Sequence, residues 1–94
     1  MAALLQPTSP VRLLHIEDSE PDHVLAMAQL RRAGLRVDAT RVETRDEFRR
    51  ALARPWDVVL SDYNLPGFTG IEALQLLRAT GRALPFILVS GEIG

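Results

Sequence analysis

The chain has 94 residues, of which 47% are hydrophobic and 24% charged, which is typical of one small globular domain. It contains no cysteine, and this excludes disulfide frameworks, thiolate metal sites and thiol catalysis. The net charge of −1 gives no sign of binding to nucleic acid or to an anionic membrane. Because the apolar runs are too short for a membrane span or a signal peptide, we expect a cytoplasmic protein.

The N-terminal part of the chain divides into a lead segment and a first strand. Residues 1–10 have no hydrophobic period and contain two prolines, which predicts a flexible lead before a domain of residues 11–94. Residues 11–16 are mostly aliphatic and are followed by the acidic pair Glu17 and Asp18. A short aliphatic run of this kind favours a buried strand.

The hydrophobic period then changes to that of a helix. Between Glu20 and Gly34 the aliphatic residues are spaced for one helix face, which includes Val24 and Leu25. Residues 35–42 alternate weakly between apolar and polar side chains, which favours a second strand.

Two capping boxes and two aliphatic runs organise the rest of the chain. The sequences Thr-Arg-Asp-Glu at 44–47 and Thr-Gly-Ile-Glu at 69–72 each predict the start of a helix. The runs at 57–61 and 85–89 predict two further buried strands. Strands therefore alternate with helices, which predicts an α/β fold with a doubly wound, mainly parallel sheet.

Polar side chains follow the predicted strands at their carboxyl ends. Glu17 and Asp18 follow the first strand, Asp62 the third and Ser90 the fourth. In a parallel sheet these ends meet at one edge, where ligands bind. Three carboxylates that approach one another repel, and Mg²⁺, which prefers oxygen ligands, would relieve that repulsion. The pattern predicts a magnesium site, whereas each acid taken alone is more typical of a helix cap or a solvated side chain.

The segments VRLLHIEDSE, WDVVLSDYNLPGFTG and LPFILVSG resemble the receiver domain of two-component response regulators. The resemblance runs from residue 11 to the last residue, with Pro66 four and Gly70 eight residues after Asp62. It implies a flavodoxin-like receiver fold with strand order 2-1-3-4-5. In this family Pro66 and Gly70 would shape the pocket loop, and Gly91 would leave room beside the phosphoryl group.

The resemblance also implies a role for each site residue. Asp62 would be the phosphoacceptor, and Glu17 and Asp18 would hold Mg²⁺ together with Asp62 and the backbone carbonyl of Asn64. Ser90 would contact the phosphoryl group through its hydroxyl. The domain would take this group from a sensor histidine kinase or a histidine phosphotransfer domain, which the first helix would contact. It would relay the signal by a conformational change, as a signalling domain rather than an enzyme.

Two features depart from the family. All 11 basic residues are arginine, so the family's active-site lysine is missing, and the last helix-strand-helix of the fold is lacking. Residues 86–89 would then form an exposed sheet edge. We expect the chain to form a homodimer through this edge, to exchange elements between protomers, or to be part of a longer ordered polypeptide.

Three alternative functions make different demands on the sequence. The missing part of the fold favours a degenerate receiver that binds proteins without phosphorylation, and binding of acetyl phosphate or beryllofluoride would distinguish it. A phosphatase of the haloacid dehalogenase type needs a second aspartate two residues after the first, where this chain has Asn64. A nucleotide-binding domain needs a glycine-rich phosphate loop, and none follows a predicted strand.

The remaining candidates have structural interpretations. We expect His15 within the sheet, His23 exposed on the first helix, and Trp56 packed at the start of the third strand. Five arginines on two helices are interleaved with acids, which favours solvated faces over a nucleic-acid patch. These arginines are Arg31, Arg32, Arg49, Arg50 and Arg54.

Overall fold

The computed structural model describes residues 9–63 and 65–90, so most of the predicted lead segment lies outside it. Its elements follow one another as β1 (Val11–Ile16), α2 (Glu20–Arg32), β2 (Val37–Val42), α3 (Arg45–Ala51), β3 (Val58–Asp62), α4 (Gly70–Ala79) and β4 (Phe86–Val89). No helix in this part of the chain has the length and apolar character needed to cross a membrane.

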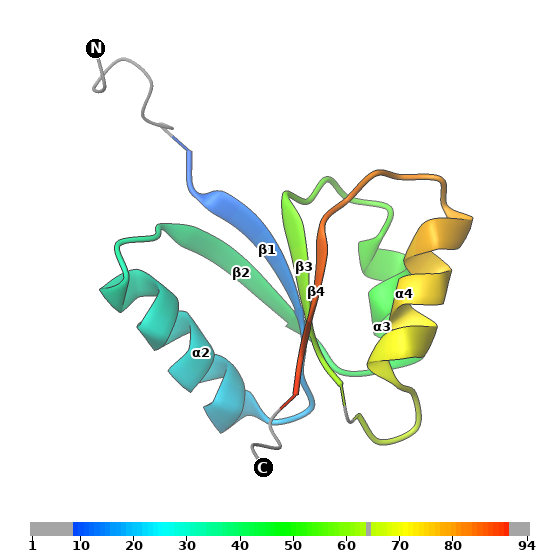
Figure 1. Ribbon diagram of the computed structural model, residues 1–94, viewed down its shortest axis with the longest axis horizontal. Coiled ribbons are helices and arrows are strands. Elements are labelled where there is room, and N and C mark those ends of the chain that lie inside the picture. The colour runs from blue at the N-terminus through cyan, green and yellow to red at the C-terminus, as the bar shows by residue number, and fades with distance from the viewer. Residues whose placement is uncertain (1–8, 64, 91–94) are drawn as a thin grey trace.

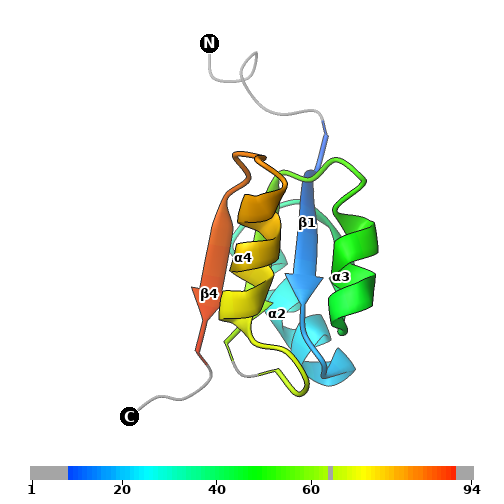
Figure 2. The same cartoon turned by 90° about the vertical axis from the view of Figure 1, so that its right-hand side faces the viewer.

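The strands form one parallel sheet in the order β2-β1-β3-β4 (Figure 1). Helix α2 covers one face of the sheet, and α3 and α4 cover the other, as Figures 1 and 2 show. The doubly wound fold and the order of the first four strands are therefore confirmed. A right-handed crossover after each strand places neighbouring helices on opposite faces wherever the strand order reverses.

The hydrophobic core lies between the sheet and the pair α3 and α4. Alternate residues of β1 and β3 point into it, because successive side chains of a strand face opposite sides. Phe48 of α3 packs there, and Phe68 lies beside it with the ring centroids 6.3 Å apart. Residues of this core with no exposed surface are Leu14, Ile16, Phe48, Val59 and Ala73.

Both predicted capping boxes are present. The Thr44 hydroxyl accepts a hydrogen bond from the Glu47 amide at 3.1 Å, and the Glu47 carboxylate accepts one from the Thr44 amide at 3.2 Å. Thr69 and Glu72 repeat the arrangement at the start of α4, at 3.1 and 2.8 Å. These bonds satisfy amides at the helix start that have no partner within the helix.

The apolar face predicted for the first helix, α2, is only partly buried. Val24 and Leu25 are 59% and 58% exposed, and Met27 is the buried residue of α2. Helix α2 packs against β2, so the side of the helix that turns toward this neighbour is set by the sheet. The spacing of aliphatic residues therefore predicted the helix correctly, and Val24 and Leu25 of its apolar face lie at the surface.

The two edges of the sheet differ in charge. β4 pairs with β3 alone among the described strands, and its sequence Phe-Ile-Leu-Val is uncharged. Ile87, Leu88 and Val89 are 51%, 36% and 46% exposed. β2, at the opposite edge, carries Asp38 and Arg41. Charged side chains protect an edge strand from pairing with other chains, and β4 has no such protection.

We expect Thr44→Ala to lower the free energy of unfolding by about 1 kcal/mol, since it removes the N-cap of α3. The measurement is urea unfolding, and an unchanged midpoint for Thr44→Ala would contradict the capping role.

Hydrogen bonds from the Glu43 and Thr44 amides lower the pKa of Glu47. A lowered pKa in the folded state contributes stability above the ordinary value, and that stability is lost as pH falls through the folded pKa. Urea unfolding of wild type and Glu47→Gln should therefore differ most at neutral pH and converge as pH falls through the folded-state pKa of Glu47.

Candidate functional site

The site is built where two neighbouring parallel strands end. Ile16 of β1 pairs with Ser61 of β3, so the next residues along both strands lie side by side. One carboxylate oxygen from each of Glu17, Asp18 and Asp62 lies within 4.8 Å of the other two. The structure thus brings the three predicted carboxylates together at one edge of the sheet.

These carboxylates have different environments. Glu17 is only 8% exposed, whereas Asp18 is exposed and Asp62 is half-buried. Burial raises the pKa of Glu17, and the neighbouring Asp18 and Asp62 raise it further. The Ser19 amide donates to the Glu17 carboxylate at 3.2 Å and opposes this effect. A hard divalent cation among the three carboxylates would favour their charged forms, and the all-oxygen donor set fits Mg²⁺.

The cluster is open to a cavity between α2 and the sheet. This cavity has a volume of about 640 Å³, and Glu17 and Asp62 lie at one end of it. Leu25, Leu60 and Val89 contribute to its apolar walls. The carboxylates of Glu17 and Asp62 are therefore accessible from this side.

The other predicted site residues surround this position. Ser90 directly follows β4 and is exposed, one residue beyond Val89, which pairs with Asp62. Pro66 is exposed and Gly70 is buried at the first position of α4. Asn64 and Gly91 lie outside the described residues.

Hydrogen bonds to the backbone hold the end of β3, and one of them comes from Ser61, which sequence reasoning does not identify as a site residue. The buried Ser61 hydroxyl donates to the main-chain oxygen of Asp62 at 2.9 Å. The Tyr63 amide donates to the Val89 oxygen at 2.9 Å, and the Gly70 amide to the Tyr63 oxygen at 3.3 Å. A serine inside an otherwise aliphatic strand is the sequence signal that points to Ser61.

His15 is buried within the sheet as predicted, but the prediction of an exposed His23 is wrong. The Nδ1 atoms of His15 and His23 are 2.8 Å apart, and His23 is half-buried. Burial, with the positive charge of Arg41 and the neighbouring His23, lowers the pKa of His15 to about 4. The pair is therefore neutral at pH 7, with one ring donating to the other. The first turns of α2 fold back over β1, and this brings together two histidines eight positions apart.

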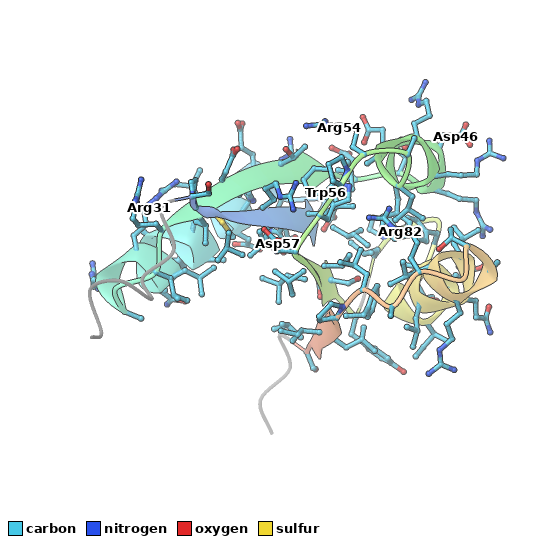
Figure 3. All side chains as sticks on the ribbon, turned by 90° about the horizontal axis from the view of Figure 1, so that it is seen from above. Arg31, Asp46, Arg54, Trp56, Asp57 and Arg82 are labelled. Atoms are coloured by element: carbon cyan, nitrogen blue, oxygen red, sulfur yellow. The ribbon has the colours of Figure 1, made fainter. Side chains whose placement is uncertain are left out.

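Trp56 packs at the start of β3 as predicted, at the end of the sheet opposite the carboxylates. Its Nε1 donates to the Ala51 oxygen at 2.7 Å, and the Arg54 guanidinium lies 4.9 Å from the ring centroid. Arg82 donates to the Leu52 and Arg54 carbonyls. Figure 3 shows Arg54, Trp56 and Arg82 near one another and Arg31 apart from them on α2.

Known proteins share both the sequence pattern and the fold. The two-component response regulator ORR41 of Oryza sativa subsp. japonica is 34% identical over 85 residues, which are 87% of this chain and 67% of that protein. No family model matches the chain.

Two solved structures have the same arrangement of strands and helices. The receiver domain of sensor histidine kinase PA1611 from Pseudomonas aeruginosa PAO1, with a magnesium ion coordinated in its active site cleft, is 29% identical with a TM-score of 0.71. The comparison covers 85% of this chain and 66% of that one. The MaeR response regulator bound to beryllium trifluoride is 26% identical with a TM-score of 0.75, over 89% of this chain and 70% of that one.

The chain thus spans about two thirds of the length of these relatives. The shared segment contains the strand ends that carry the acidic cluster, and the strand order is the one that the receiver resemblance implies. The chain belongs to the receiver-domain family of two-component response regulators.

Proposed function

We propose that this chain is the phosphoacceptor of a two-component phosphorelay and carries the phosphoryl group on Asp62. The observation that supports this most directly is the cluster of Glu17, Asp18 and Asp62 at the end of β1 and β3. A receiver domain of a sensor histidine kinase is among the similar structures, which supports a histidine kinase or a histidine phosphotransfer domain as the donor. We place this function in the cytoplasm, where such donors present their phosphohistidine.

The chemistry requires a nucleophile, a donor and neutralised charge. An oxygen of the Asp62 carboxylate attacks phosphorus, the phosphorus–nitrogen bond of the phosphohistidine breaks, and the imidazole leaves with the bonding electron pair. Glu17, Asp18, Asp62 and the Asn64 carbonyl would hold Mg²⁺, which neutralises the phosphoryl oxygens when bound. The product is an acyl phosphate on Asp62, toward which Ser90 would donate its hydroxyl.

Helix α2 supplies a surface for the donor domain in this proposal. Val24 and Leu25 are exposed on α2, which begins three residues after Glu17. An apolar patch beside the acidic cluster would let a histidine-bearing helix bury its own apolar residues while its histidine faces Asp62. The catalytic contribution of this chain is confined to its own phosphorylation and dephosphorylation.

Treatment with acetyl phosphate and Mg²⁺ should add the mass of one phosphoryl group to the intact chain. Asp62→Asn should abolish the adduct because the nucleophile is lost, whereas the exposed Asp38→Asn should retain it. The measurement is intact-mass spectrometry at neutral pH. An adduct that persists in Asp62→Asn would place the acceptor elsewhere, and a folded wild type without any adduct would favour the degenerate receiver.

Mg²⁺ should stabilise the folded chain. At a free concentration ten times the dissociation constant, binding adds about 1.4 kcal/mol to the free energy of unfolding. The raised pKa of Glu17 contributes stability at low pH that is lost as pH rises through that pKa, so Mg²⁺ should act more strongly at pH 7.5 than at pH 4.5. Thermal melts with Mg²⁺ or EDTA measure this. Asp18→Ala should remove the shift and Asp38→Asn should keep it, and a shift that survives Asp18→Ala would refute the site.

We also propose that β4 pairs with β4 of a second copy. An antiparallel pair around a two-fold axis would bring β4 against its own copy, with no charge repulsion because β4 is uncharged. Light scattering should give the mass of a dimer, and Leu88→Lys should shift it to that of a monomer. A matched change at the other edge, Thr40→Lys, should leave the dimer intact. A monomeric wild type at high concentration would contradict the pairing.

A further inference from the structure

Ser61 is a buried polar residue directly before Asp62, and the proposed chemistry does not use it. Its side chain has no exposed surface and faces the core between the sheet and α4. Its hydroxyl donates to the main-chain oxygen of Asp62 at 2.9 Å. A buried hydroxyl costs free energy unless it is hydrogen-bonded, and the Ser61 hydroxyl makes its bond to the main chain of Asp62.

The peptide group between Asp62 and Tyr63 is held at both ends. Ser61 binds its oxygen, and its amide donates to the Val89 oxygen of β4 at 2.9 Å. The next carbonyl, that of Tyr63, accepts a hydrogen bond from the Gly70 amide at 3.3 Å. The backbone that follows Asp62 is therefore hydrogen-bonded to β4 and to the first residue of α4.

Gly70 packs directly against the same peptide. A Cβ atom at this position would lie 3.0 Å from the Asp62 oxygen and 3.2 Å from the Ser61 hydroxyl, and would also collide with Leu88. Any side chain at residue 70 would therefore press on the group that Ser61 holds. The close approach of α4 explains why glycine occupies its first position.

We propose that Ser61 is a positioning residue for Asp62. The hydrogen bond to the Asp62 oxygen, together with the close contact of Gly70, fixes the plane of the peptide group between Asp62 and Tyr63. This plane in turn sets the direction in which the Asp62 side chain leaves the backbone. In-line attack on phosphorus depends on that direction, and small displacements of a reacting group are costly. This inference rests on the proposed function and adds the group that orients its nucleophile.

The first test compares Ser61→Ala with Val59→Ala in the complete chain. Val59 is fully buried on the same strand and the same face, so its truncation loosens the core without touching the Asp62 oxygen. With acetyl phosphate at saturating Mg²⁺ and a temperature at which all variants are folded, Ser61→Ala should react roughly tenfold more slowly. Val59→Ala should stay within about twofold of wild type, since a structural defect alone does not reorient Asp62.

Amide hydrogen exchange gives a readout independent of phosphorylation. The Tyr63 amide should exchange faster in Ser61→Ala, because the peptide loses one of its two attachments. The Val59 amide, which donates to the Pro85 oxygen at 2.9 Å, should exchange as in wild type. Unchanged exchange at Tyr63 would overturn the inference whether or not Asp62 is phosphorylated.

A second pair of variants approaches the peptide from α4. Leu88→Ala removes the side chain that a Cβ at residue 70 would meet, so the double variant Gly70→Ala/Leu88→Ala presses mainly on the Asp62 oxygen and Ser61. The double variant should react more slowly than Leu88→Ala alone.

The outcomes of these tests separate the two proposals. Wild-type rates in both Ser61→Ala and the double variant would overturn the positioning role, as would an equal loss in Val59→Ala. An adduct that remains in Asp62→Asn would instead overturn the proposed function itself.

Discussion

The parallel pairing of β1 with β3 is the constraint on which the site depends. Ile16 opposite Ser61 places Glu17, Asp18 and Asp62 beside one another. A register shift of one residue would turn alternate side chains to the opposite face, exposing Leu14, Ile16 and Val59, which have no exposed surface. The burial of these aliphatic side chains therefore offsets the repulsion among the carboxylates and holds them together.

The two faces of the sheet have different roles. The face toward α3 and α4 contains most of the core. On this face Ser61 and Gly70 contact the main-chain oxygen of Asp62 at the end of β3. The face toward α2 is less completely covered and contains the neutral His15–His23 pair and the cavity beside the carboxylates. Packing on one side and access on the other would suit the group transfer that we propose for this site.

Local interactions place the helices that form this support. The capping boxes begin α3 and α4 at residues that the sequence specifies, and the ring of Phe48 then packs in the core. Arg45 of α3 reaches Glu72 of α4 at 2.8 Å, and Glu72 also accepts the hydrogen bond from the amide of Thr69, the N-cap of α4. One exposed side chain thus joins the helix start to the neighbouring helix, although an exposed ion pair of this kind adds little stability by itself.

Much of this molecule was predictable from the order of residues alone. Short aliphatic runs, capping boxes and acids at strand ends act over a few positions, so the strands, the helix starts and the grouping of Glu17, Asp18 and Asp62 followed from local pattern and the geometry of parallel sheets. Tertiary packing decided the rest. The exposure of Val24 and Leu25 depends on how α2 lies on the sheet, and the His15–His23 contact depends on the path of the chain between β1 and α2. The role of Ser61 depends on packing too, because its local hydrogen bond to the Asp62 oxygen lies where Gly70 of α4, a residue distant in the sequence, closes on the end of β3.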